Sequence, residues 1–237
     1  ERNRLDIFAP ETRADAALPV LLFVHGGGFT MGDKTAPNSP FYDNVGLWAV
    51  RNGMLGVTMT YRLAPEHLWP SGSDDVSLAV NWLREHAAAQ GGDPTRIYVM
   101  GQSAGAHMAG ILAVEHPSEI KRALMLYPPT DAQDIISRYQ QVPPIIDSPE
   151  ALTILEDYIG QSPKIVSLND AFVVRNSLPG RIANSATRSK YFLIHGRADP
   201  LVPSRQSVRL CNALTKSSSS ADFDTGSSSP TIQSVGT

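Results

Sequence analysis

The five residues Gly101-Gln102-Ser103-Ala104-Gly105 constrain the fold of this chain more than any other stretch. An apolar run of β type, Arg96–Met100, precedes them, and small, helix-compatible residues follow from Ala106. A strand, a G-x-S-x-G turn and a helix in this order are typical of a nucleophile elbow. Such a turn strains the backbone of the serine, and the flanking small residues let the strand and the helix approach each other. We therefore expect Ser103 to project its hydroxyl from a sheet edge, at a helix N-terminus whose dipole favours negative charge.

Length and charge place the chain among single-domain globular proteins. It has 237 residues, of which 42% are hydrophobic, enough for one sizeable core. The 20 basic and 23 acidic residues are scattered, which argues against nucleic acid or an anionic membrane as the main partner. A single cysteine, Cys211, excludes an intrachain disulfide and a cysteine-based metal site. No membrane span or signal peptide is visible; because the chain begins at Glu1, the compartment stays open, with a soluble cytoplasmic protein slightly favoured.

Continuous apolar runs alternate with helical patterns along the chain. The runs of strand length lie at 5–8, 19–24, 54–61, 96–100, 123–127 and 191–195. One helix is expected at 42–52 and a second after a cap formed by Ser73-Asp74-Asp75. A third is expected directly after the elbow. Strands that are apolar throughout are buried on both faces, and their alternation with helices indicates parallel pairing. The predicted fold class is α/β, a mostly parallel, doubly wound sheet with helices on both faces.

Two segments depart from this alternation within the single domain expected over 1–237. About sixty residues, 128–189, carry no strand pattern but contain expected helices at 149–159 and 167–175. We expect a helical lid or cap there, with Leu155 and Phe172 shaping an acyl pocket; the alternative is a surface excursion that covers one sheet face. From 217 to 237, eight of 21 residues are serine, a composition typical of disordered or foreign sequence.

The run His25-Gly26-Gly27-Gly28 follows a strand directly, at the sheet edge where ligands bind in parallel sheets. Glycines let backbone N–H groups face a ligand without obstruction by a Cβ. A tetrahedral oxyanion needs two or three such donors, and we expect them from Gly27, Gly28 and Ala104. A phosphate-binding loop is disfavoured because no G-x-G-x-x-G or G-K-[ST] pattern follows the strand. His25 is expected to order this loop rather than to act as a base.

Asp199 follows the strand 191–195 and precedes Pro200. A carboxylate just past a strand end is well placed to hold an imidazole in the right tautomer. In isolation a plain turn aspartate would be the simpler interpretation. The order of Ser103 and then Asp199 is the one that an α/β-hydrolase requires.

Together these motifs resemble those of the α/β-hydrolase esterases of the hormone-sensitive-lipase and feruloyl-esterase-like (BD-FAE) groups. The similarity spans roughly Leu5 to Leu214, with several motifs in the same order and spacing. The matching stretches are HGGGF at 25–29, GDK at 32–34, YRLAPEH at 61–67, GDP at 92–94, GQSAGAH at 101–107 and HGRADPLVP at 195–203.

The resemblance implies serine-dependent hydrolysis of short-chain acyl esters, with a small-molecule ester as partner and neither a cofactor nor a metal. Ser103 would attack the carbonyl, and Asp199 would orient a histidine. Two alternatives stay open: an arylformamidase-like amide hydrolase, and a non-catalytic binding protein with a hydrolase fold. The intact elbow and the glycine-rich loop favour an enzyme, because a binding pocket needs neither. The oligomeric state is left open.

The histidine that should complete the triad is missing from its expected place. In the similar families it follows a further strand, about thirty residues beyond the acid, which is near Ser229 here. No histidine follows His195, and no eighth-strand pattern is visible. We expect His107 to pack behind the elbow and His195 to support the Asp199 loop. We also expect the C-terminal part to be truncated or altered, and these 237 residues alone to hydrolyse esters very slowly.

Overall fold

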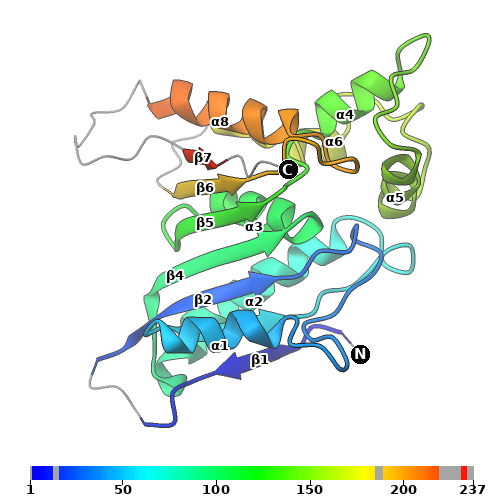
Figure 1. The fold of residues 1–237 in the computed structure, drawn as a ribbon. Helices are drawn as coiled ribbons and strands as arrows, with labels where there is room; N and C mark the ends of the chain where they lie inside the picture. The colour runs from blue at the N-terminus through cyan, green and yellow to red at the C-terminus, as the bar shows by residue number, and fades with distance from the viewer. Residues whose placement is uncertain (1, 13–15, 185–188, 219–230, 234–237) are drawn as a thin grey trace.

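The computed structural model describes residues 2–12, 16–184, 189–218 and 231–233, and in this part of the chain seven strands form one sheet (Figure 1). Their order is β1-β3-β2-β4-β5-β6-β7; β1 runs antiparallel to β3, and the other neighbours are parallel. The strands are β1 (Leu5–Phe8), β2 (Leu18–Val24), β3 (Leu55–Met59), β4 (Gly92–Gln102), β5 (Ile120–Leu126), β6 (Lys190–Ile194) and β7 (Thr231–Gln233). The helices are α1 (Asp43–Arg51), α2 (Ser71–His86), the 3₁₀ helix η1 (Ala87–Gln90), α3 (Ala104–Glu115), α4 (Ala132–Tyr139), α5 (Pro149–Ile159), α6 (Ala171–Arg175), α7 (Leu178–Ala183) and α8 (Arg205–Ser218).

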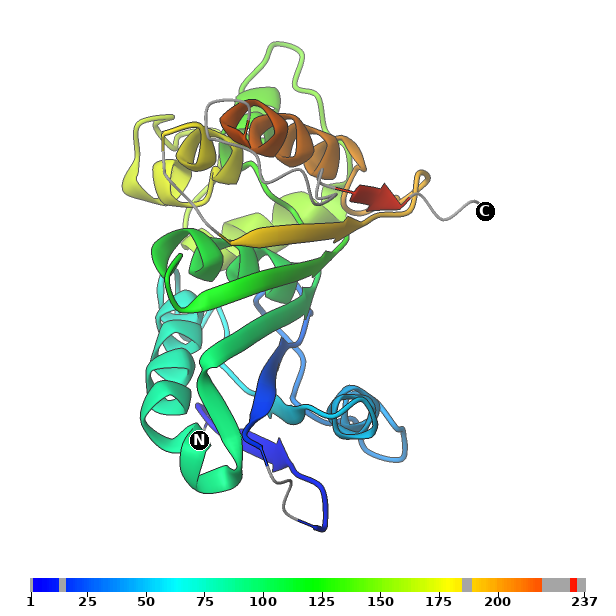
Figure 2. The same cartoon turned by 90° about the vertical axis from the view of Figure 1, so that its left-hand side faces the viewer.

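Helices cover both faces of the sheet (Figure 2). α1 packs on β1, β2 and β3, while α2 and α3 pack together on the opposite face. α1 approaches β3 closely because Gly46 and Gly56 meet; a Cβ on Gly56 would lie 2.5 Å from the Gly46 carbonyl oxygen. The α/β class and the mostly parallel, doubly wound sheet predicted from the sequence are confirmed.

The main core lies between the sheet and the helices on the α2 and α3 side. β3 is buried along its whole length, as its continuous apolar sequence requires. On β4 and β5 alternate residues are fully buried, among them Val99 and Ala123. These side chains form one apolar cluster with residues of α2 and α3 such as Leu83 and Leu112. The core thus holds rigidly the strand ends that carry the predicted site.

Helices α4 to α7 form the long connection between β5 and β6. The predicted helix 149–159 is observed with those bounds, because the Ser148 hydroxyl caps it and Pro149 opens it. The second predicted helix is shorter than expected: α6 begins only at Ala171, where the Asp170 side chain accepts the N–H of Phe172. α4 and α7 were not predicted.

The C-terminal region differs from the expectation of a structureless tail from residue 217. Ser217 lies in α8, which continues to Ser218. Residues 231–233 form β7, with Ile232 paired in register with Leu193 of β6. Three residues are too few to show a periodic pattern, whereas the open edge of β6 supplies backbone donors and acceptors for an added strand. The remaining tail residues, 219–230 and 234–237, lie outside the described part.

Replacing Gly105 by alanine should destabilise the protein severely. A Cβ there would lie 2.1 Å from the Val24 carbonyl oxygen and 2.4 Å from that of His25, both backbone atoms that cannot move aside. We expect a loss of at least about 3 kcal/mol in the free energy of unfolding, measured by urea denaturation with circular dichroism. The matched control is Gly180→Ala in α7, where a Cβ meets nothing within 4 Å. That variant should gain roughly 0.5–1 kcal/mol. Equal midpoints for the two variants would contradict the prediction.

Candidate active site

Ser103 stands between β4 and α3 with backbone angles φ 51° and ψ −120°. A positive φ strains a residue that has a side chain, and it persists only where the surrounding packing requires it. The Ser103 N–H donates to the carbonyl of Leu126 on β5 (2.9 Å). Gly105 lets α3 start directly against the end of β2. The backbone therefore makes the sharp turn that the motif predicts, and the half-buried Ser103 lines a cavity.

The glycine-rich loop after β2 lies beside this turn. Gly27 and Gly28 have φ values of +111° and +59°, and the Gly27 carbonyl accepts the N–H of Met31 (3.0 Å) in a tight turn. Gly28 and Ala104 line the same cavity as Ser103. Among the described backbone hydrogen bonds, none is donated by the amides of Gly28 or Ala104, so both can serve a ligand. Gly27, the third expected donor, shapes the turn and is not among the residues that line the cavity.

His25 holds the glycine-rich loop in place through contacts in the protein interior. Its side chain is fully buried, its Nδ1–H donates to the Gly26 carbonyl (2.6 Å), and its ring stacks on Tyr61 at 4.3 Å. The Tyr61 hydroxyl donates to the His25 carbonyl (3.0 Å). Arg2 donates to the carbonyls of Tyr61 and Gly32, both at 2.6 Å. Burial lowers the pKa of His25 to about 4, so the imidazole is neutral at pH 7. Its hydrogen bond to the Gly26 carbonyl keeps it in the loop.

Asp199 lies on the loop after β6, and its carboxylate is held by backbone amides. One oxygen accepts the N–H groups of Leu201 (2.9 Å) and Val202 (2.8 Å), an arrangement that fixes the side chain within its own turn. The other oxygen lies 3.7 Å from Nε2 of His195. Leu201 and Val202 line the cavity together with Ser103. The structure therefore brings the acidic loop to the cavity of the serine.

None of the six histidines, all of which lie in described residues, forms a hydrogen bond with the Ser103 hydroxyl. His195 donates through Nε2 to the Val202 carbonyl (2.7 Å) and contacts the Ser207 hydroxyl through Nδ1 (2.7 Å). The buried ring of His107 bonds the Pro129 carbonyl through Nδ1 (2.6 Å) and the Asn176 side chain through Nε2 (2.7 Å). Both rings have both nitrogens engaged, so neither is placed as the base.

The cavity above Ser103 is small and mostly apolar, with a volume of about 90 Å³. For comparison, a cavity of about 150 Å³ holds a benzene ring. Its walls come from the glycine-rich loop, the elbow, α4, α5, the Asp199 loop and the start of α8. The lining residues are Gly28, Phe29, Ser103, Ala104, Pro129, Ile135, Tyr139, Asp147, Ala151, Ile154, Leu155, Leu201, Val202, Pro203, Arg205 and Gln206. Leu155 is among them, but Phe172 packs with Trp69 and Tyr158 in a second apolar cluster instead.

Within the described residues, no group of three or more histidine, cysteine, aspartate or glutamate side chains is placed to hold a metal ion. In the same part of the chain, every helix is too short or too polar to cross a bilayer.

The topology of the site identifies the class of protein. A serine on a sharp turn after a central parallel strand, followed in the chain by an acid after a later strand, is the arrangement of α/β-hydrolases. The fold is accordingly that of an α/β-hydrolase. The family model described as BD-FAE matches residues 5–214, and the chain belongs to that family.

Several similar proteins are esterases by name. Esterase LipQ of Mycobacterium tuberculosis is 27% identical over 225 residues, which cover 90% of this chain and 49% of LipQ. Carboxylesterase NlhH of the same species is 42% identical over 98 residues, 40% of this chain and 29% of NlhH. The chain thus spans about half the length of the curated relatives that it matches along most of its own length, such as LipQ and LipM.

Solved structures of esterases share the fold. EstE1, a thermophilic carboxylesterase cloned from a metagenomic library, superposes with a TM-score of 0.73 at 20% identity, over 98% of this chain and 74% of EstE1. Carboxyl esterase 2 of Tuber melanosporum superposes with a TM-score of 0.70 at 21% identity, over 98% and 71% of the two chains. At this level of identity the likeness concerns the fold alone.

Sequence reasoning did not identify the charged residues that line the cavity, Asp147 and Arg205. Asp147 follows two isoleucines in a loop, and Arg205 opens a helix; neither belongs to a motif. Only the fold brings these two residues together across 58 positions of sequence.

The neutral, buried state of His25 should make stability depend on pH. Its pKa is about 4 in the folded protein and 6.5 in the unfolded chain, so the unfolded state binds the extra proton between these values. The stability due to neutral His25 is complete above pH 6.5, and about 3 kcal/mol of it is lost as the pH falls to 4. Urea denaturation from pH 7 to 4 should show a shallower decline for His25→Gln than for the wild type. Comparing slopes cancels the constant cost of the substitution; parallel curves would contradict the prediction.

Proposed function

We propose that the protein is a serine hydrolase that cleaves carboxylic esters through an acyl-enzyme on Ser103. The observation that carries this proposal is the placement of Ser103, at a strained φ of 51°, in one cavity with the amides of Gly28 and Ala104. A nucleophile beside two backbone donors is the arrangement that acyl transfer requires, because negative charge develops on the carbonyl oxygen in the transition state. The esterase names of LipQ, LipM and NlhH support the same reaction.

In the proposed reaction the Ser103 oxygen adds to the ester carbonyl, and its proton passes to a base. Gly28 and Ala104, with Gly27 as the third candidate donor, stabilise the oxyanion. The alcohol leaves with a proton, and water then hydrolyses the acyl-enzyme. The role of Asp199 would be to orient an imidazole base, but all six histidines lie in described residues and none of them occupies that place. Without a base, the oxyanion donors and binding alone retain about 10³–10⁴-fold catalysis over water.

We infer further that the acyl group is short. The cavity of about 90 Å³ is smaller than the one of about 150 Å³ that accepts benzene, so it suits an acyl chain of a few carbons. Helices α4 and α5 act as the cap of this pocket: Ile135 lines it from α4, and Ile154 and Leu155 line it from α5. A Cβ on Gly28 would meet Ile154 at 3.0 Å, so the cap reaches the glycine-rich loop directly.

Ser103→Ala should abolish both ester hydrolysis and covalent labelling by a fluorophosphonate. The variant keeps the backbone but removes the only proposed nucleophile. In a protein that holds the imidazole base this loss costs about 10⁴-fold or more in kcat, and in these 237 residues the slow turnover should fall to the background rate. Turnover of p-nitrophenyl acetate and mass spectrometry of the labelled protein measure the two effects. Ser118→Ala, at an exposed serine in the loop after α3, is the matched control and should behave as wild type. A tenth of wild-type turnover in Ser103→Ala would overturn the assignment.

Comparison of acetate esters with N-formylkynurenine separates an esterase from an amide hydrolase.

Leu155→Ala and Phe172→Ala should act differently, although both remove an apolar side chain of the cap. Leu155 lines the cavity, so its truncation should raise kcat/KM for p-nitrophenyl octanoate relative to butanoate. Phe172 is 5% exposed in the second apolar cluster, with Trp69 and Tyr158. Its truncation should instead cost roughly 3–5 kcal/mol of stability and leave the substrate ratio unchanged. Steady-state rates and urea denaturation of both variants provide the test. A shifted substrate ratio in Phe172→Ala, with none in Leu155→Ala, would place the pocket elsewhere.

A further inference from the structure

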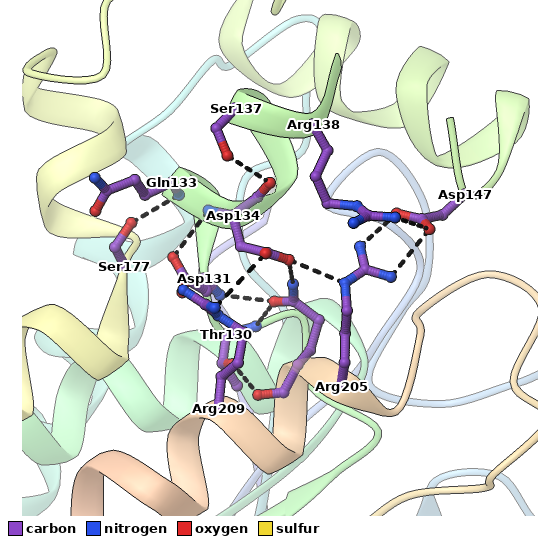
Figure 3. A network of polar contacts seen from close by, with 11 residues as sticks. Thr130, Asp131, Gln133, Asp134, Ser137, Arg138, Asp147, Ser177, Arg205 and Arg209 are labelled. Carbon is purple, nitrogen blue, oxygen red and sulfur yellow. Dashed lines mark hydrogen bonds and ion pairs between the residues drawn. The ribbon is translucent and has the colours of Figure 1, made fainter. Parts of the chain in front are cut away.

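The lining of the cavity is apolar except for a few side chains, and its two charged members face each other. The Arg205 guanidinium donates to both carboxylate oxygens of Asp147, with Nη1–Oδ1 at 3.0 Å and a second bond from Nη2 to Oδ2 (Figure 3). Such a two-bond fork is more directional than a single ion contact. Both side chains are partly exposed, 29% for Arg205 and 22% for Asp147, so the pair lies at the solvent side of the cavity wall.

This pair joins two elements that are distant in sequence. Arg205 is the first residue of α8, and Asp147 directly precedes Ser148, the N-cap of α5. Three residues of α5, Ala151, Ile154 and Leu155, form part of the cavity wall. The size of the cavity on this side therefore depends on the position of the start of α5 relative to α8.

Arg205 belongs to the fixed side of the pair. It also donates from Nε to Asp134 of α4 (3.1 Å). The next residue, Gln206, is fully buried, donates to the same Asp134 oxygen (2.9 Å), and accepts the N–H groups of Thr130 (2.9 Å) and Asp131 (2.8 Å). This satisfied buried network holds α8 against α4 without any contribution from Asp147.

Asp147 lies at the start of α5, whose position depends on the ion pair with Arg205. The segment 141–146 before it is exposed throughout, and Val142 is 97% exposed. Besides Arg205, Asp147 accepts a bond from Arg138 (3.2 Å), and the N–H of Ile145 donates to the Arg138 carbonyl (3.0 Å). Burial acts to raise the pKa of Asp147, but the hydrogen bonds from Arg205 and Arg138 outweigh it and hold the pKa below its usual value. The carboxylate is therefore charged at neutral pH.

We propose that the Arg205–Asp147 ion pair fixes the α5 wall of the cavity and thereby limits the length of the acyl chain that the cavity accepts, an inference that rests on the proposed ester hydrolysis. Asp147 touches no reacting atom in this role; it determines specificity by positioning α5. Loss of its carboxylate frees the start of α5 to move outward, while the network around Gln206 keeps α8 in place. The cavity then lengthens without a change at Ser103.

The test is the chain-length profile of Asp147→Ala, with Asp147→Asn as a second variant of nearly unchanged shape. We expect the ratio of kcat/KM for p-nitrophenyl octanoate to that for butanoate to rise about tenfold in Asp147→Ala. Asp147→Glu, which keeps the carboxylate, should restore most of the wild-type profile. The matched control is Glu150→Ala, which removes a carboxylate from the exposed first turn of the same helix and should keep the wild-type ratio.

The salt dependence of the substrate ratio distinguishes an ion pair from a purely structural role of Asp147. Because the pair is partly exposed, added NaCl should screen it and raise the octanoate ratio of the wild type, but not that of Asp147→Ala. An unchanged ratio in both Asp147 variants, or an equal rise in Glu150→Ala, would overturn the inference. If the wild type hydrolyses neither ester, the proposed function fails separately. Calorimetric titration then measures the affinities for butanoate and octanoate and so tests the ion pair without turnover. A rise of about tenfold in the octanoate affinity relative to butanoate in Asp147→Ala supports the inference, and an unchanged ratio of the two affinities refutes it.

Discussion

The close approach of the start of α3 to the end of β2 is the constraint on which the candidate site depends. No side chain fits at Gly105, where a Cβ would lie 2.1 Å from the Val24 carbonyl oxygen. The helix can therefore begin one residue after Ser103, and its first amide, that of Ala104, comes to the cavity that Gly28 also lines. The strain at Ser103, of order 1–3 kcal/mol, is sustained by the buried packing of α3 on the sheet. The packing of α3 on the sheet thus fixes the orientation of Ser103 toward the cavity.

The connection between β5 and β6, which carries α4 to α7, is held in place by two kinds of contact. One is polar and buried: Gln206 of α8 holds the segment after β5 through the backbone amides of Thr130 and Asp131. A fully satisfied polar network of this kind permits one arrangement only, because any other leaves buried groups unpaired. The other is aromatic: Phe29 of the glycine-rich loop stacks on Tyr158 of α5 at 3.8 Å. Residues of α5 and of the glycine-rich loop therefore line the same cavity and contact each other directly.

Local patterns predicted the elements whose causes are local. The bounds of α5 follow from Ser148, Pro149 and the left-handed Gly160, all readable in the sequence. The start of α2 did not follow from its sequence: Ser73-Asp74-Asp75 was expected as a cap, but the helix begins at Ser71. Asp75 is instead buried and paired with Arg62 at 2.8 Å, since a contact 13 residues away outweighs a local cap. The short helices α4 and α7 and the strand β7 were missed for the same reason, because tertiary contacts rather than a long periodic pattern support them.

The α/β class, the sharp turn at Ser103, the glycine-rich loop and the place of Asp199 after Ser103 in the chain all followed from the amino-acid sequence. These features rest on residue types that a turn or a buried strand requires wherever it occurs. The place of His195 in the Asp199 loop was expected as well, whereas the bond from His107 to Asn176, 69 positions away, is set by the tertiary structure. It alone also decided that Asp147 and Arg205 meet in the cavity wall. Side-chain hydrogen bonds between distant segments leave no periodic trace in a sequence, because their partners are chosen by the packing of the elements that carry them.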